Sequence, residues 1–169
     1  TEADLGANAV DQQQKKLMVA MVEKEGRFGR KNGKGFYDYP EKGKGQKSLW
    51  SGIAALQPKH LDPDTLDVEE LKQRFLVAQA VEAARTVEDH VIVDPREADV
   101  GSILGFGFAP FTGGTLSYID FMGTKNFVAL CHKLEAKYGS RFTPPKLLED
   151  MAAKGETFYS RFPPKKAAA

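Results

Sequence analysis

The stretch Gly105-Phe106-Gly107-Phe108-Ala109-Pro110-Phe111-Thr112-Gly113-Gly114 decides how this chain folds. Four glycines and three phenylalanines fall within these ten residues. Glycine reaches backbone angles that are closed to other residues, and it lets another backbone or a ligand approach closely. Pro110 fixes its own φ and pushes Ala109 towards extended geometry. Helical patterns enter and leave the stretch, so it predicts an apolar elbow between two helices.

Two interpretations of this elbow remain open. The favoured one is structural: Gly107, Phe108, Pro110, Gly113 and Gly114 shape a turn around which helices pack. This interpretation predicts a buried Phe108 and a positive φ at Gly113 or Gly114. It also places Lys125 on a solvent face. The alternative is that the backbone or the aromatic rings of the elbow border a ligand site.

The chain on both sides of the elbow is dominated by helical periodicity. The longest predicted helix runs over about 68–90, is apolar nearly all round in its middle and is therefore central. Asp67 would cap it, with Glu70 completing a capping box. Further helix starts are predicted at Asp94-Pro95 and at Thr124, which would cap the helix that follows Gly123. The remaining helices are predicted at about 115–122 and from a start at Thr143-Pro144-Pro145 to a stop at Gly155.

Glu82 stands within the apolar middle of the long predicted helix. A carboxylate in such surroundings needs a partner or takes up a proton. Arg85, one turn further on, is the partner that we expect, because side chains three residues apart meet on a helix surface. This structural role is favoured over a catalytic one.

The first part of the chain predicts a helix over about 11–24, a glycine-rich loop and a short extended segment near 36–39. Four cations lie in the loop: Arg27, Arg30, Lys31 and Lys34. They could contact an anion such as a phosphate of a coenzyme tail, or they could be a solvated basic loop. The solvated loop is the favoured interpretation.

Composition excludes several classes of function. The 169 residues carry a net charge of +1, which gives no argument for nucleic-acid binding. The single Cys131 indicates a reducing compartment, and with the scattered His60, His90 and His132 it predicts no metal site. No run approaches the ~18 apolar residues of a membrane span. Neither a dinucleotide-binding glycine fingerprint nor a Gly-x-Ser-x-Gly nucleophile elbow is present, so we expect no catalytic residue.

Two segments resemble a known family. The segment Gly26-Arg27-Phe28-Gly29-Arg30-Lys31-Asn32-Gly33-Lys34-Gly35-Phe36-Tyr37-Asp38-Tyr39 resembles the one that follows the first C-terminal domain of L-3-hydroxyacyl-CoA dehydrogenases. A second set is similar to the second C-terminal domain of the fatty acid oxidation complex α-subunit. It comprises Arg74 through Glu82-Ala83, Ala98-Asp99, the elbow, and Tyr118-Ile119-Asp120. Together the two segments cover about residues 26–160.

The resemblance implies an all-α domain of the 6-phosphogluconate-dehydrogenase C-terminal type. It divides the chain into a remnant of a preceding helical domain (1–25), a connecting loop (26–48), the helical domain (49–162) and a flexible tail (163–169). The parent protein would be a bacterial, cytoplasmic enzyme of β-oxidation that uses NAD and carries a fused enoyl-CoA hydratase. Because Thr1 is not an initiator Met, we expect the parent to extend before it.

In that family the helical domains support the NAD-binding domain and border the acyl-CoA cleft. The residues expected nearest to acyl-CoA are Leu104, Gly105 and Phe106, together with the four cations of the basic loop. Relatives have Tyr in place of Leu104 and Pro in place of Ala109, and Leu104 cannot donate the hydrogen bond of a Tyr. The expected partners are the NAD-binding and hydratase domains, acyl-CoA and a thiolase subunit. This chain alone would bind no cofactor. The alternative is an autonomous interaction or dimerisation module.

Overall fold

The computed structural model describes residues 2–6, 10–41, 44–56 and 61–164. The chain divides into two compact units, Thr1–Leu66 and Asp67–Ala169, and each is described by itself. The expected domain boundaries at 25, 48 and 162 are not tested by this division and stay a prediction. His60 and the last five residues of the expected tail lie outside the described residues.

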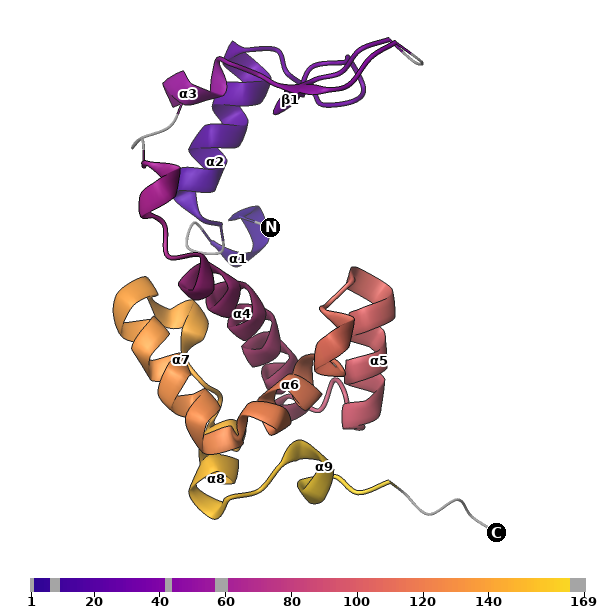
Figure 1. The fold of residues 1–169 in the computed structure, drawn as a ribbon, viewed down its shortest axis with the longest axis vertical. Helices are drawn as coiled ribbons and strands as arrows, with labels where there is room; N and C mark the ends of the chain where they lie inside the picture. The colour runs from indigo at the N-terminus through magenta and orange to yellow at the C-terminus, as the bar shows by residue number, and fades with distance from the viewer. Residues whose placement is uncertain (1, 7–9, 42–43, 57–60, 165–169) are drawn as a thin grey trace. The chain divides into compact units, whose positions relative to one another are not determined.

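The second unit is built from helices joined by short turns (Figure 1). Their order is α4 (Val68–Glu88), α5 (Pro95–Phe106), the 3-10 turn η4 (Pro110–Thr112), α6 (Thr115–Met122), α7 (Thr124–Tyr138), the 3-10 turn η5 (Ser140–Phe142), α8 (Lys146–Lys154) and α9 (Phe158–Arg161). The prediction of an all-α protein is confirmed, with helix bounds close to those expected from the periodicity.

Helix α4 is the centre of the hydrophobic core, as its sequence predicted. Its middle buries Val77, Ala80, Val81 and Ala84 completely. The facing side chains come from α6, α7, α8 and α9, and the largest of them are Leu116, Ile119, Phe127, Leu134, Leu148, Met151 and Phe158. Full burial of side chains of this size is the main favourable term for the fold.

Two of the predicted helix starts are confirmed and one is wrong. The side chain of Asp67 accepts a hydrogen bond from the Glu70 N–H at 3.0 Å, and that of Asp94 accepts one from the Arg96 N–H at 2.9 Å. Thr124 does not cap α7, because the N-cap is Gly123 and Thr124 is already helical. Its hydroxyl instead donates to the carbonyl of Glu156 at 3.0 Å, which ties the start of α7 to the end of α8.

Three other helix starts are capped by carboxylates from distant positions. Glu88 of α4 accepts from the Leu147 N–H of α8 at 2.7 Å, and Asp120 of α6 accepts from the Phe158 N–H of α9 at 2.8 Å. Asp99 of α5 caps α6 in the same way. We call Glu88, Asp99 and Asp120 the remote caps. Burial raises the pKa of Asp120, and its hydrogen bonds from the N–H groups of α9 oppose that rise.

The first unit contains α1 (Glu2–Leu5), α2 (Gln12–Val19), a π-helical turn η2 (Ala20–Lys24), β1 (Tyr37–Asp38), β2 (Ser48–Leu49), α3 (Ile53–Leu56) and the 3-10 turn η3 (Pro63–Thr65). The predicted first helix is thus α2 continued by η2. The expected extended segment is β1, which pairs antiparallel with β2 through Tyr37 opposite Leu49 and Asp38 opposite Ser48. Among the described residues of this unit, Met21 is the one buried hydrophobic side chain.

Candidate functional site

The elbow begins where α5 ends. Gly107 takes a left-handed conformation with φ of 75°, and the next N–H, that of Phe108, donates to the carbonyl of Ser102 at 3.0 Å. A left-handed glycine just past the last turn is a common way to end a helix. Gly113 and Gly114 both have positive φ, at 82° and 120°, as expected for the end of the elbow.

Gly114 is needed because Asp99 lies directly against its backbone. A Cβ at Gly114 would lie 2.4 Å from the Cβ of Asp99, closer than real Cβ contacts allow. The carboxylate of Asp99, only 2% exposed, accepts from the Leu116 N–H at 2.7 Å and from the Ser117 hydroxyl at 2.6 Å. Asp99 thereby satisfies N–H groups at the start of α6, which lacks a capping side chain of its own. The elbow therefore joins α5 to α6 through a buried carboxylate.

The three phenylalanines of the elbow have different surroundings. Phe108 is 2% exposed and meets the ring of Tyr118 edge-on, with 6.3 Å between the ring centroids. Phe106 and Phe111 are 61% and 87% exposed. Phe108 thus anchors the turn in the protein, as expected, while its two neighbours face outwards.

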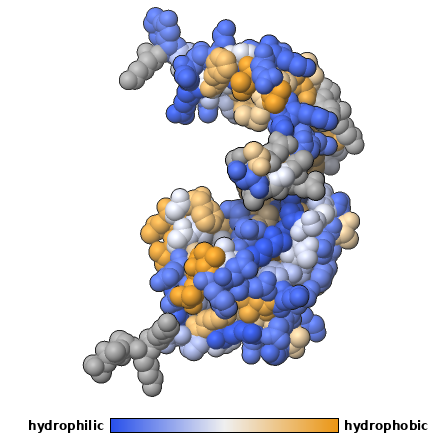
Figure 2. All heavy atoms as spheres, turned by 180° about the vertical axis from the view of Figure 1, so that it is seen from behind, coloured by the Kyte–Doolittle hydropathy of each residue, from blue (hydrophilic) through white to orange (hydrophobic). Residues whose placement is uncertain are grey.

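Exposed apolar side chains continue from the elbow along α5. Leu104 is 81% exposed and Val100 is 57% exposed. Phe106 and Gly101 line a hollow of about 350 Å³ between α5 and α4, whose other wall includes Ala83, whereas Val100 and Leu104 lie outside its lining. We call Val100, Leu104 and Phe106, with this hollow, the α5 surface. Figure 2 shows hydrophobic side chains gathered on the α5 side of this unit. Uncovered apolar residues in such a group indicate an interaction site.

The expected acyl-CoA residues of the elbow all belong to this surface. Leu104, Gly105 and Phe106 are exposed in the last turn of α5, and a Cβ at Gly105 would meet no atom within 4 Å. Leu104 presents only carbon to the surface. The site can therefore contact an apolar partner or an acyl chain, but Leu104 cannot orient a carbonyl by a hydrogen bond.

The four cations of the basic loop are not equivalent. Arg27 is buried: its Nε donates to the carbonyl of Gly35 at 2.6 Å, it pairs with Asp38, and its guanidinium lies 4.3 Å from the ring centre of Trp50. The side chains of Arg30, Lys31 and Lys34 are exposed. Arg27 therefore holds the loop together. The other three cations are exposed to solvent, and the guanidinium of Arg30 lies 5.8 Å from the ring centre of Tyr39.

The candidates for chemistry in the described part of the chain are metal-binding clusters, Cys131 and Glu82. No group of three or more His, Cys, Asp or Glu side chains that could hold a metal ion is found among the described residues. Burial raises the pKa of Cys131 to about 12, so its thiol stays protonated at neutral pH. Glu82 is paired with Arg85 at 2.7 Å, the structural role that we favoured, although its carboxylate is 67% exposed rather than buried.

Fold and site together define a helical domain with exposed apolar side chains on α5. The chain is 42% identical over 134 residues to the fatty acid oxidation complex subunit alpha of Shewanella amazonensis. The aligned region covers 79% of this chain and 19% of the relative. The chain is also 42% identical over 137 residues to the subunit of the same name from Shewanella halifaxensis, again covering 79% of this chain and 19% of the relative.

These matches confirm the family resemblance, and they are consistent with a C-terminal region of that multifunctional subunit. The chain spans 19% of the length of the curated relatives that it matches. No protein-family model matches it. Among the described helices, none is both long and apolar enough to cross a membrane.

Sequence reasoning noticed Asp99 but did not assign it a cap. Its signal was present, since an acidic residue stands inside the apolar pattern of one helix and the next helix starts at Gly113-Gly114 without a capping side chain. That combination indicates a cap supplied from elsewhere in the fold.

Proposed function

We propose that this chain is the C-terminal helical domain of a bacterial, cytoplasmic 3-hydroxyacyl-CoA dehydrogenase of fatty acid β-oxidation. The parent reaction is the NAD-dependent oxidation of L-3-hydroxyacyl-CoA to 3-ketoacyl-CoA, in a chain that also carries enoyl-CoA hydratase. In this proposal the domain supports the NAD-binding domain and the acyl-CoA cleft. It has no activity and binds no NAD by itself.

The observation that carries the proposal is the 42% identity to fatty acid oxidation complex alpha subunits, which covers 79% of this chain. The α5 surface supports the same interpretation. Val100, Leu104 and Phe106 are exposed, and a partner domain that covered them would remove their apolar area from water. The α5 surface is the part of this domain that we assign to the contact with the NAD-binding domain and the cleft.

The basic loop has a separate role in the proposal. The exposed Arg30, Lys31 and Lys34 provide positive charge for a phosphate of coenzyme A, while Arg27 keeps the loop in shape. A contact of this kind between exposed charges weakens as salt screens it. Its contribution is to attract the coenzyme rather than to fix the reacting atoms.

Reconstitution tests the proposal. The NAD-binding domain of a related alpha subunit is mixed with this chain, and consumption of NADH with a 3-ketoacyl-CoA is followed by absorbance. This chain alone should give no turnover, and its addition should raise the activity of the NAD-binding domain. Leu104→Asp should abolish that gain because it places a charge on the α5 surface, whereas Lys125→Asp, on an exposed position of α7, should preserve it.

An autonomous interaction module is the alternative, and the exposed α5 surface would then bind a second copy or a thiolase subunit. The same samples discriminate the two by their mass in solution. A stable dimer of this chain that dissociates on Leu104→Asp, without any gain in dehydrogenase activity, would favour the alternative. Sustained turnover by the repurified chain alone would contradict both.

A further inference from the structure

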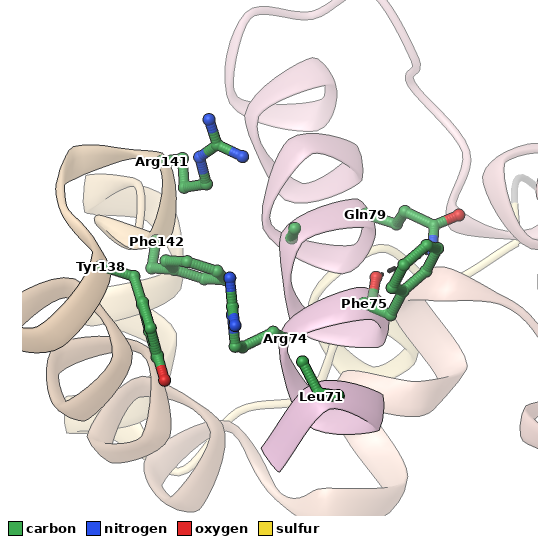
Figure 3. A pocket seen from close by; sticks show the side chains of 8 residues that line it. Leu71, Arg74, Phe75, Gln79, Tyr138, Arg141 and Phe142 are labelled. Atoms are coloured by element: carbon green, nitrogen blue, oxygen red, sulfur yellow. Dashed lines mark hydrogen bonds between the residues drawn. The ribbon is translucent and has the colours of Figure 1, made fainter. Parts of the chain in front are cut away.

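A second hollow in the helical unit has a chemistry different from that of the α5 surface. It has a volume of about 510 Å³ and lies over α4, between that helix and the end of α7 with η5. Eight residues line it: Leu71, Arg74, Phe75, Ala78, Gln79, Tyr138, Arg141 and Phe142. Two of them are arginines and none is an acid. Figure 3 shows Arg74 reaching from α4 towards Tyr138 and Phe142, with Phe75 and Gln79 on the other side of α4.

Arg74 is held in position but lacks an acceptor among the described residues. Its guanidinium carbon lies 3.9 Å from the ring centre of Tyr138, a stacked arrangement that fixes the plane of the group. The Nε atom is buried and finds no hydrogen-bond partner among the described residues. A buried donor of a charged group that stays unpaired is costly, so this atom calls for an explanation.

The acidic side chain nearest in sequence does not provide the acceptor. Glu70, one turn before Arg74, accepts from the ammonium of Lys137 at 2.7 Å and from the hydroxyl of Tyr138. These contacts lower the pKa of Glu70 and keep its oxygens occupied. Tyr138 thus stacks on Arg74 with its ring while its hydroxyl is bound elsewhere.

We propose that this hollow binds an amphiphilic oxyanion, a carboxylate or phosphate carried on an apolar body. The planar guanidinium of Arg74 presents donors in a fork that matches either oxyanion, and Arg141 adds positive charge at the rim. Leu71, Ala78 and the ring of Phe75, which is 77% exposed, form the apolar wall for the body of the ligand. Ligand sites of this size combine an apolar lining with a few placed polar groups.

This proposal does not rest on the proposed dehydrogenase function. The hollow uses α4, α7 and η5, whereas the α5 surface uses α5 and the opposite lining of α4. The two sites share Gln79. The test of the hollow depends on Arg74 and the test of the α5 surface depends on Leu104, and neither residue belongs to both sites. Failure of one test therefore leaves the other standing.

The test is a titration of the full chain followed by NMR, with the Arg74 Nε–H signal and the backbone amides of α4 and α7 as reporters. Four probes are compared: octanoate, octyl phosphate, octanol and inorganic phosphate, each below its aggregation concentration. Octanoate or octyl phosphate should bind saturably and shift the Arg74 Nε–H signal. Octanol and inorganic phosphate should bind at least about tenfold more weakly, because each lacks one half of the recognised chemistry.

Two variants examine the two halves of the site. Arg74→Gln should weaken binding of the better probe by about tenfold or more, the usual effect of removing a charged hydrogen-bond partner. Phe75→Ala should weaken binding by a smaller factor without disturbing the fold, because that ring is mostly exposed. Phe121→Ala, at a phenylalanine of α6 that is 91% exposed, is the control and should bind as the parent does.

The outcomes separate cleanly. Tighter binding of octanoate assigns the site to carboxylates, tighter binding of octyl phosphate assigns it to phosphates, and either supports the proposal. Octanol binding as well as the two anions would overturn it, as would inorganic phosphate binding as well as octyl phosphate. Shifts centred on Phe106 rather than on Arg74, or equal losses in Phe75→Ala and Phe121→Ala, would also overturn it.

Discussion

Gly114 and Asp99 form a pair in which each residue depends on the other. The carboxylate can reach the first N–H groups of α6 only because Gly114 has no side chain, and the φ of 120° at Gly114 is one that other residues rarely adopt. The sequence predicted the turn and the positive φ from the glycines alone. It could not identify Asp99 as the partner, because hydrogen bonds to Leu116, 17 residues away, depend on how α5 and α6 pack.

Replacing Gly114 tests this pair. Gly114→Ala should destabilise the protein by about 2–4 kcal/mol, because it combines a strained positive φ with a clash against Asp99. Gly105→Ala is the matched control: its Cβ meets nothing within 4 Å in a regular helix, so it should be neutral or slightly stabilising. Denaturant unfolding followed by circular dichroism measures both. Equal midpoints for the two variants would show that the close approach to Asp99 is relaxed in solution.

The sequence predicted that Phe108 is buried, but it could not predict how exposed Phe106 and Phe111 are. All three phenylalanines of the elbow have the same chemistry, so residue type alone does not separate them. Which ring turns inwards depends on the left-handed Gly107, which directs the chain so that Phe108 enters the protein and Phe106 stays outside. Arg74 was noticed only as part of a family motif, because its stacking on Tyr138 joins positions 64 residues apart in sequence.

At the scale of elements, α4 and α7 are joined by a polar contact as well as by the core. Glu70 of α4, expected to complete a local capping box, instead binds Lys137 and Tyr138 of α7. The helical periodicity predicted where both helices lie in the sequence. The periodicity could not predict that Glu70 binds α7 rather than the start of its own helix, because its carboxylate finds hydrogen-bond donors in either arrangement.

This contact should make stability depend on pH. The folded pKa of Glu70 lies below its ordinary value of 4.5, so its contribution is present above pH 4.5 and is lost as pH falls through the folded pKa. The free energy of unfolding of the parent should therefore exceed that of Glu70→Gln most at neutral pH. The difference should shrink below pH 4.5.

Urea unfolding of both proteins from pH 7 to pH 3 measures that difference. Glu69→Gln is the control, because Glu69 and its partner Lys72 are 75% and 63% exposed and a pair of this kind contributes little at any pH. A difference between the parent and Glu70→Gln that stays constant across the range would show that the Gln variant loses packing rather than charge.

At the scale of the whole molecule, the two units differ in how many hydrophobic side chains each of them buries. The residues of the hydrophobic core cluster all belong to the unit Asp67–Ala169, whereas Met21 is the one buried hydrophobic side chain among the described residues before it. Small units that bury little apolar surface are marginal on their own.

Separate preparation of the two units checks this difference. Residues 67–169 alone should unfold cooperatively and keep the amide chemical shifts that the same core residues have in the full chain. Residues 1–66 alone should show no cooperative transition, because they lack a core. Calorimetry and NMR on the two pieces give the result. A sharp transition for 1–66, or an unfolded 67–169, would contradict the assignment of the core to one unit.

The all-α class and most helix positions could be predicted from the sequence, because periodicity and glycine stops are local signals. The α5 surface could be predicted only in part. The residues Leu104 and Phe106 were identified through the family resemblance, but the hollow that Phe106 lines depends on how α4 and α5 are placed in the fold. The Arg74 hollow could not be predicted, because its walls come from α4, α7 and η5.

The remote caps have a consequence for the order in which the protein folds. Glu88, Asp99 and Asp120 reach N–H groups that are 59, 17 and 38 residues away in sequence. Each of these hydrogen bonds requires that the chain segment between the carboxylate and its N–H partner first closes into a loop. Interactions absent from the transition state act on the rate of unfolding rather than on the rate of folding. We therefore expect the three carboxylates to act mainly on unfolding: their hydrogen bonds should form after the helices have met and should slow the separation of those helices.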